Sequence, residues 1–214
     1  MLDDQRKIIF IHQEKTGGTS VAIALFGHDE GARYGADKTY DKGFTKHFSV
    51  QKAREVCGEA KWNSYFRFSV VRNPWDRLVS KWCWRREGAL HKGCSLAELK
   101  ASYLTPTKAG HIPMKWFEQE IREECARWNL KAPDDFHFGG GELQLQLHHF
   151  LRFESLESDW NELVATKQWH CQPFPHANKT ASREADYRKY YTPQTERFVA
   201  EHFRRTIEHF GYTF

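Results

Sequence analysis

Short apolar segments alternate along this chain with longer stretches in which apolar residues recur every three or four positions. Residues 7–12 (KIIFIH) and 65–71 (YFRFSVV) are short and rich in β-branched and aromatic residues, and turn-forming residues follow each of them, which is typical of buried parallel strands. Residues 149–154 (HFLRFE) predict a third strand. Because helical segments lie between them, we expect an α/β fold with a parallel sheet, helices on both faces and a ligand crevice at the carboxyl ends of the strands.

The expected helices cover residues 19–26, 50–57, 75–87, 114–128 and 157–166. Ser49 is a capping residue for the second of them, and Ser95 with Glu98 forms a capping-box pattern for a further short helix. Thr192 followed by Pro193 predicts the start of a last helix. Its apolar positions recur at helical spacing, which indicates one continuous helix through Val199, Phe203, Ile207 and Phe210.

Composition places the chain among soluble globular proteins. Its 214 residues suit one domain, 1–214, and its hydrophobic and charged fractions, 40% and 28%, exclude disorder, collagen and coiled coil as descriptions of the whole chain. No apolar run approaches the ~20 residues that cross a bilayer, and the first residues do not resemble a signal peptide. We therefore expect a cytoplasmic protein without stable membrane insertion.

The charge and the cysteine content of the chain limit the kinds of ligand and the redox compartment that we expect for it. The net charge of +4 is too small to indicate a nucleic-acid-binding face but suits an anion held locally. The five cysteines form no CxxC pair, which favours free thiols in a reducing compartment. The His and Cys spacing lacks the pairing of a structural zinc site, so no metal is expected.

The strongest chemical signal is the loop after the first strand. Gly17 and Gly18 allow a sharp bend and a close approach to a ligand, and the helix that follows presents backbone N–H groups at a positive dipole end. The charge of Lys15 precedes the glycines, and hydroxyl donors come from Thr16, Thr19 and Ser20. An ordinary strand-to-helix turn has similar residues, but this order favours an anion site. Lysine before the glycines also differs from the Walker A order GxxxxGK[ST].

A second signal lies at the end of the next strand. Arg72 offers a bidentate fork to a phosphate, with a structural ion pair as its alternative. Ser80 lies opposite the apolar stripe of the following helix and would face the same crevice or solvent. Trp84 is off the stripe and could stack on a sugar or pack at an exposed edge. The stripe consists of Trp75, Leu78, Val79 and Trp82.

The sequences IFIHQEKTGGTSV and FSVVRNPWDRLVSKW together resemble the paired phosphate-binding signatures of sulfotransferases that use 3′-phosphoadenosine 5′-phosphosulfate (PAPS), in particular the carbohydrate branch with heparan sulfate 2-O-sulfotransferase-like and bacterial members. This resemblance implies a P-loop-like three-layer fold. Residues 15–20 would wrap the 5′-phosphosulfate, Arg72 and Ser80 would hold the 3′-phosphate, and residues 88–147 would be a helical insertion on the acceptor side. Closure over the nucleotide would come from Asn178, Lys179 and Thr180.

The implied reaction moves a sulfonate in line from PAPS to an acceptor hydroxyl and releases 3′-phosphoadenosine 5′-phosphate (PAP). The resemblance also implies that this acceptor is a carbohydrate. Lys15 would neutralise the leaving oxygen, and the position of His47 makes it the expected general base, with His12 as the rival. Glu14 stands where the family usually has proline. The alternatives are a P-loop kinase or nucleotide hydrolase that needs Mg²⁺, and a PAP-binding module without turnover. The acceptor and the oligomeric state are not predicted.

Overall fold

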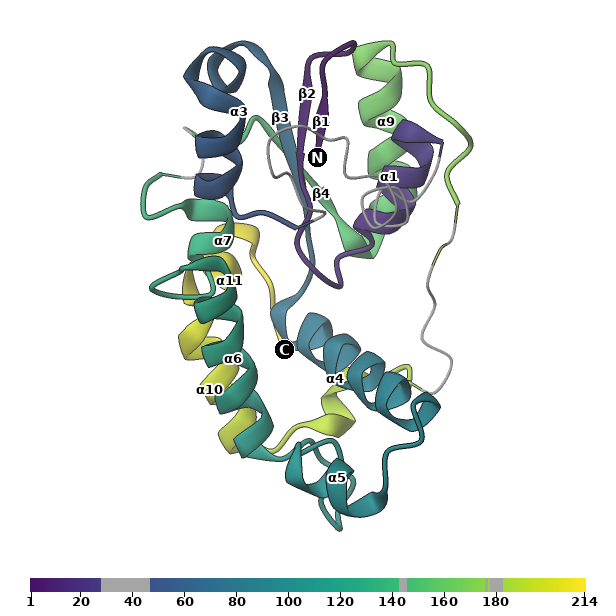
Figure 1. Cartoon of the computed structure of the whole chain (residues 1–214), viewed down its shortest axis with the longest axis vertical. Coiled ribbons are helices and arrows are strands. Elements are labelled where there is room, and N and C mark those ends of the chain that lie inside the picture. The colour runs from purple at the N-terminus through teal and green to yellow at the C-terminus, as the bar shows by residue number, and fades with distance from the viewer. Residues whose placement is uncertain (28–46, 143–145, 176, 178–182) are drawn as a thin grey trace. The chain divides into compact units, whose positions relative to one another are not determined.

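The computed structural model describes residues 1–27, 47–142, 146–175, 177 and 183–214. The excursion expected over residues 27–46 therefore lies, from residue 28, outside the described residues. The chain divides into two compact units, each built from two segments (Figure 1). Unit 1 comprises Met1–Arg72 and Asp135–Lys179, and unit 2 comprises Asn73–Asp134 and Thr180–Phe214. This division does not test the expectation of one domain, which stays a prediction.

A four-stranded sheet in the order β1-β2-β3-β4 organises unit 1. The strands β2 (Ile8–Ile11), β3 (Phe66–Val71) and β4 (His149–Arg152) run parallel, as the sequence predicts. The additional strand β1 (Leu2–Asp3) pairs antiparallel with β2. Its two residues are too few to produce a recognisable alternation, so the sequence does not reveal it.

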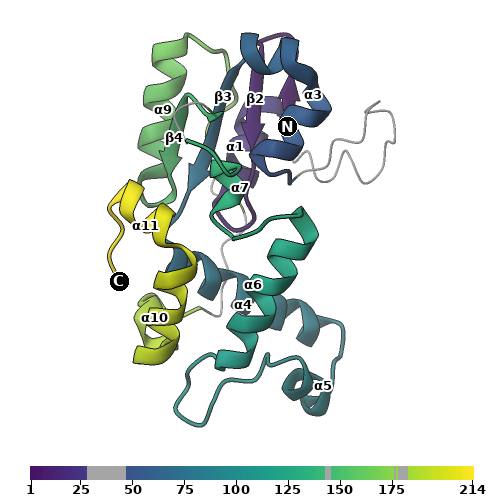
Figure 2. The same cartoon turned by 90° about the vertical axis from the view of Figure 1, so that its left-hand side faces the viewer.

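Helices cover both faces of this sheet (Figures 1 and 2). On one face α1 (Gly18–Phe26) and α9 (Leu156–Lys167) bury alternate strand residues such as Phe10, Phe68 and Leu151 in one apolar cluster. On the other face lie α3 (Val50–Ser64) and the single turn α7 (Asp135–Phe138), which pack against each other. The expected α/β fold, a largely parallel sheet flanked by helices, is confirmed.

Two boundaries in unit 1 differ from the sequence expectation by more than one residue. Ser49 caps α3 as expected, its hydroxyl accepting from the Lys52 N–H at 3.3 Å, but α3 continues to Ser64 across an interruption at Gly58, where φ is +78°. The third strand ends at Arg152, because a 3₁₀ turn, η1 (Phe153–Ser155), leads into α9. Both differences arise where local backbone geometry changes without a change in apolar spacing.

Unit 2 is helical in the residues described. It contains α4 (Pro74–His91), α5 (Leu96–Ala101), α6 (Met114–Trp128), the 3₁₀ turn η2 (Tyr187–Tyr190), α10 (Pro193–His202) and α11 (Arg204–Phe210). The capping box of Ser95 and Glu98 is confirmed, and Thr192 caps α10 together with Thr195. None of the helices described in either unit is long and apolar enough to cross a membrane.

The prediction of one continuous terminal helix is wrong. The chain breaks at Phe203, where φ is −114° and ψ is 26°. The Asp134 carboxylate accepts hydrogen bonds from the N–H groups of Arg205 at 2.8 Å and of Thr206 at 3.2 Å, so it caps the start of α11. Asp134 lies about 70 positions earlier in the chain, and apolar spacing within the helix carries no trace of such a cap.

The first ten residues of α4 are buried on every side. The expected stripe is buried, and Arg77, Ser80 and Lys81 on the other side are buried as well. Carboxylates of α6 meet these cations: Glu124 lies 3.1 Å from Arg77, and Glu120 lies 2.7 Å from Lys81. The interpretation of Ser80 as a solvated helix position is therefore wrong.

Candidate functional site

The loop between β2 and α1 turns sharply through two left-handed residues. Lys15 has φ of +66° and Gly17 has φ of +80°. The buried Thr16 hydroxyl donates to the Gln13 carbonyl at 2.9 Å, and the Ser20 N–H donates to the Gly17 carbonyl at 3.0 Å. The Thr16 hydroxyl, expected as a donor to a ligand, thus closes the turn itself in this structure. The loop enters α1 as a preformed bend.

The two glycines are required by packing against the protein. A Cβ atom at Gly17 would lie 2.6 Å from Leu156 Cδ2 and 3.0 Å from Phe153 Cδ2, and one at Gly18 would collide with the His12 ring. The sharp bend expected from the sequence is present. The close approach, however, is to side chains that support the loop, so the N–H groups at the start of α1 are the remaining candidate for contact with a ligand.

The N-terminus of α1 suits an anion. The N-cap residue of this helix is Gly17, which has no side chain to cap it, and the first turn of the helix holds no acidic residue. The first N–H groups of a helix have no partner within it, and the dipole adds about half a positive charge at this end. An anion placed here would receive backbone hydrogen bonds together with a favourable field.

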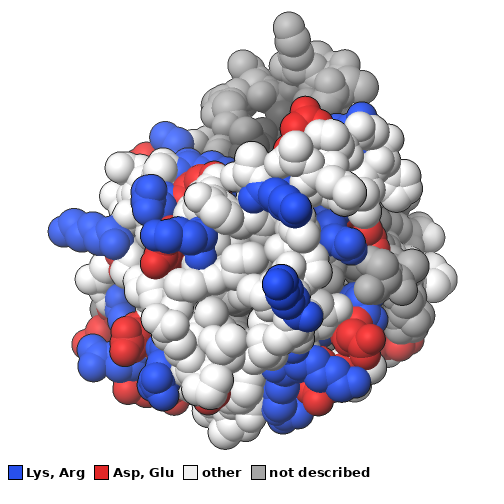
Figure 3. Space-filling view, turned by 90° about the horizontal axis from the view of Figure 1, so that it is seen from below, with Lys and Arg blue, Asp and Glu red and all other residues white. Residues whose placement is uncertain are grey.

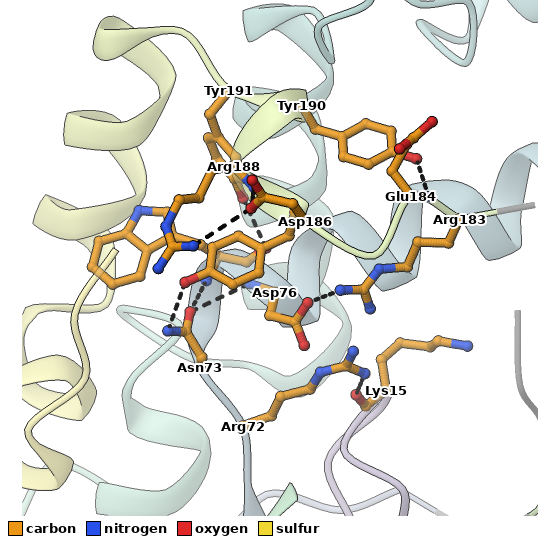
Figure 4. Close-up of polar contacts among 12 residues, drawn as sticks. Lys15, Arg72, Asn73, Asp76, Arg183, Glu184, Asp186, Arg188, Tyr190 and Tyr191 are labelled. Carbon is orange, nitrogen blue, oxygen red and sulfur yellow. Dashed lines mark hydrogen bonds and ion pairs between the residues drawn. The ribbon is translucent and has the colours of Figure 1, made fainter. Parts of the chain in front are cut away.

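Arg72 holds this loop against the end of β3. Its Nη1 donates to the Lys15 carbonyl at 2.8 Å, as Figure 4 shows, and its guanidinium carbon lies 3.8 Å from the centre of the Phe153 ring. The side chain is only 6% exposed. The carboxyl ends of β2, β3 and β4 thus meet around one cation. Phe153 was not singled out in the sequence, although its place near the end of the predicted strand 149–154 could have suggested it.

His12 and His47 form a pair beside the loop. His47 Nδ1 lies 2.9 Å from the His12 carbonyl oxygen, and the two rings meet edge to face with centroids 4.4 Å apart. A carbonyl oxygen only accepts, so Nδ1 of His47 carries the proton and its neutral ring has the lone pair on Nε2. The His12 ring is buried between Phe10 and Gly18. The expectation that His12 supports the loop stays a prediction.

A second buried histidine joins α7 to the sheet. The Ser69 hydroxyl donates to the Ile11 carbonyl at 2.6 Å and lies 2.9 Å from Nε2 of His137. Because the hydroxyl proton is already used, His137 donates through Nε2. The pair thus bridges β2, β3 and α7 as a structural contact. The sequence analysis did not single out His137, and nothing in its spacing marks it.

The other predicted site residues fall elsewhere. Ser80 lies in unit 2, buried on α4. Asn178, Lys179 and Thr180 lie outside the described residues. Just before them, the Ala177 N–H donates to the Ser20 hydroxyl at 3.1 Å, so this part of the chain reaches the first turn of α1.

The start of α4 in unit 2 is fixed by side chains from its own unit (Figure 4). Asn73 caps α4 and donates to the Thr213 carbonyl at 2.9 Å. Asp76 pairs with Arg183, and the Tyr191 hydroxyl donates to the Trp75 carbonyl at 2.9 Å. Burial raises the pKa of Tyr191 well above its usual range, so it acts as a neutral donor.

A sequence model of the sulfotransferase family matches residues 1–213. No curated protein and no solved structure matches the chain significantly. No group of three or more His, Cys, Asp or Glu side chains within the described ranges is arranged to hold a metal ion.

Proposed function

Because the chain belongs to the sulfotransferase family, we propose that it moves a sulfonate group from PAPS to an acceptor hydroxyl and releases PAP. The family supports sulfonate transfer in general. The observation that carries the nucleotide part of the proposal is the N-terminus of α1, which follows a strand and a left-handed glycine, has no acidic residue in its first turn and has Arg72 bonded to the loop before it.

The donor phosphates would bind around residues 15–20 and Arg72. The 5′-phosphosulfate would accept from N–H groups at the start of α1, while Lys15 would neutralise the bridging oxygen as it leaves. Arg72 and Ser80 would bind the 3′-phosphate. Since one Arg72 nitrogen already holds the Lys15 carbonyl, Arg72 would also shape the loop that contacts the sulfonate. Asn178, Lys179 and Thr180 would close over the nucleotide.

His47 would be the general base. With the Nδ1 proton donated to the His12 carbonyl, Nε2 is the nitrogen able to accept a proton from the acceptor hydroxyl. As the base accepts that proton, the new O–S bond forms and the bond from sulfur to the phosphate oxygen breaks. His12 would keep the ring of His47 in place.

The acceptor would be a carbohydrate, as in the heparan sulfate 2-O-sulfotransferase-like branch that the sequence resembles. Residues 88–147 would face it. Glu14 lies half-buried next to Lys15. A negative charge there would weaken nucleotide binding, so the substitution Glu14→Gln should strengthen it.

A thermal-shift titration tests nucleotide binding first. PAP and PAPS should raise the melting temperature without metal, because a ligand that binds only the native state stabilises it by about 2.7 kcal/mol at 100 times its Kd. Lys15→Gln should reduce the shift. Lys52→Gln, on the exposed surface of α3, is the matched control and should not. ATP binding that needs Mg²⁺, without any effect of PAP, would overturn the proposal in favour of a kinase.

A transfer assay with labelled PAPS and a panel of glycans tests the chemistry. His47→Gln should keep the shift caused by PAP yet reduce turnover about 10²–10⁴-fold, the range for loss of a general base. Normal turnover by this variant would place the base elsewhere. PAP binding by the wild type without transfer to any acceptor would indicate a binding module.

A further inference from the structure

The large apolar side chains that stand exposed in the described parts of the chain gather in one region of unit 2. They are Trp84, Leu90, Leu96 and Tyr103, with Leu96 74% and Trp84 58% exposed. All four fall within residues 84–111, which comprise the end of α4, α5 and the loop after it, and which we call the α4–α5 end. A concentration of exposed large apolar side chains in one segment makes that segment a candidate contact with a partner or a membrane.

Hydrogen bonds and a buried side chain fix the backbone around the exposed Leu96. The capping box of Ser95 and Glu98 fixes the start of α5 directly beside Leu96. Leu99, one turn further along α5, is buried and anchors the helix. The Cys94 N–H donates to the Ala89 carbonyl at 3.1 Å, so a backbone hydrogen bond closes the turn between α4 and α5. Leu96 therefore projects outward from an ordered turn.

Tyr103 is held in a similar way. Its φ is +55°, a left-handed conformation that costs a non-glycine residue about 1–2 kcal/mol. Its carbonyl accepts from the Trp82 indole N–H at 3.2 Å, which ties the loop to α4. The backbone thus keeps an aromatic side chain at the surface although the conformation is unfavourable.

The same region is basic. Residues 84–111 contain five Lys and Arg against two Glu, a net charge of +3 in a chain whose total is +4. Lys92, Lys100 and Lys108 are exposed. Arg85 instead pairs with Glu120 and Glu123 of α6. Figure 3, which views the side where Figure 1 shows α5 at the bottom, shows several Lys and Arg side chains separated by uncharged surface, with Asp or Glu beside some of them.

We propose that the α4–α5 end docks on the surface of an anionic lipid bilayer. Trp and Tyr favour the interface between headgroups and acyl chains, leucines gain from contact with the acyl region, and lysines attract anionic headgroups. A glycan would use the aromatic rings but gain little from the two exposed leucines. A protein partner is disfavoured because lysine is depleted in protein interfaces. Docking of this kind requires no membrane-spanning helix.

Co-sedimentation with vesicles tests this inference, and it needs neither nucleotide nor turnover, so its outcome is separate from that of the proposed function. The protein should bind vesicles of phosphatidylcholine with phosphatidylserine, and bind vesicles of phosphatidylcholine alone much less. Binding should weaken as salt is raised. Each of Lys92→Gln, Lys100→Gln and Lys108→Gln should weaken it about fivefold.

Leu96→Gln should also reduce binding, with its melting temperature measured to show that the fold is kept. Lys189→Gln, another exposed lysine of unit 2, is the matched control and should bind like the wild type. Equal sedimentation of wild type and Leu96→Gln would overturn the proposal. So would retention on an immobilised acidic polysaccharide without any vesicle binding, which would assign the basic surface to a polyanion.

Discussion

The two units bury very different interiors. In unit 1 the sheet and the helices α1 and α9 enclose one apolar cluster that includes Phe10, Phe68 and Trp160. In unit 2 the contact between α4 and α6 contains cations and carboxylates that are almost fully buried: Arg77 and Lys81 on one helix, Glu120 and Glu124 on the other. One interior is dominated by the hydrophobic effect, and the other combines apolar packing with paired charges.

This difference determines how the stability of each unit responds to substitution of a single side chain. Burial raises the pKa of Glu120 although Lys81 and Arg85 act to lower it, so desolvation outweighs the attraction of its partners. A buried ion pair of this kind adds little net stability over apolar packing, yet loss of one partner leaves an uncompensated charge. Unit 2 should therefore tolerate changes of charge poorly, whereas unit 1 should respond mainly to changes of volume.

Loss of one carboxylate from the buried network should give the largest effect. Glu124→Leu leaves Arg77 and Lys81 short of a counter-charge and should lower the free energy of unfolding by about 3–5 kcal/mol, measured by urea denaturation. Glu118→Gln, on the outer side of the same helix, should change it by less than about 0.5 kcal/mol. Similar values for the two variants would remove the contrast between the units.

A change of side-chain volume in the core of unit 1 should have the next largest effect on the free energy of unfolding. Leu151 is completely buried in the cluster of unit 1, so Leu151→Ala should cost about 2–5 kcal/mol in the same measurement. The identical substitution at exposed Leu96 provides the control and should be close to neutral. A large loss at Leu96 would mean that this side chain is not exposed in solution.

The contact between the loop and His12 should give an intermediate effect. Gly18→Ala directs a Cβ into the His12 ring and should cost about 1–3 kcal/mol. In the double variant with His12→Ala the collision is absent, so a double-mutant cycle should show a favourable coupling of about 0.5–3 kcal/mol. Strict additivity would show that the ring does not support the helix start.

The smallest expected effect is on the pH dependence of the free energy of unfolding. The pKa of His148 is lowered, first by burial and then by nearby Arg67, and its Nδ1 accepts from the Arg67 N–H at 2.9 Å. Since the folded-state pKa lies below the unfolded value of about 6.5, the unfolded chain binds the proton first, and stability present above pH 6.5 is lost on acidification below it. His148→Asn should flatten this decline in urea titrations at several pH values. An unchanged decline would assign it to other groups.

The sequence predicts the sheet of unit 1 well because the signals there are local. Apolar runs followed by Gly17 or by Asn73 mark the strand ends, and caps such as Ser49 mark helix starts. The buried charges of α4 were not foreseen, since their partners lie some 40 positions away on α6 and single-sequence periodicity treats Arg and Lys as solvent-facing. The same reason hides the Asp134 cap of α11.

In the candidate site, too, the features that depend on local sequence were predicted and those that depend on distant segments were not. The bend at Gly17 and the position of Arg72 at a strand end follow from spacing alone. That the Thr16 hydroxyl closes its own turn, and that Phe153 lies under the Arg72 guanidinium, depends on side-chain orientation and on a third strand far along the chain. Such contacts form only after the sheet is assembled.

The order of the segments has a consequence for dissection of the protein. The chain passes between the units three times, after Arg72, Asp134 and Lys179, so neither unit is a continuous piece that could be excised by itself. A stop codon after Asp134 would remove β4 and α9, and with them Leu151, Trp160 and Leu163 from the interior of unit 1. Limited proteolysis would accordingly yield nicked but associated fragments rather than two separable halves.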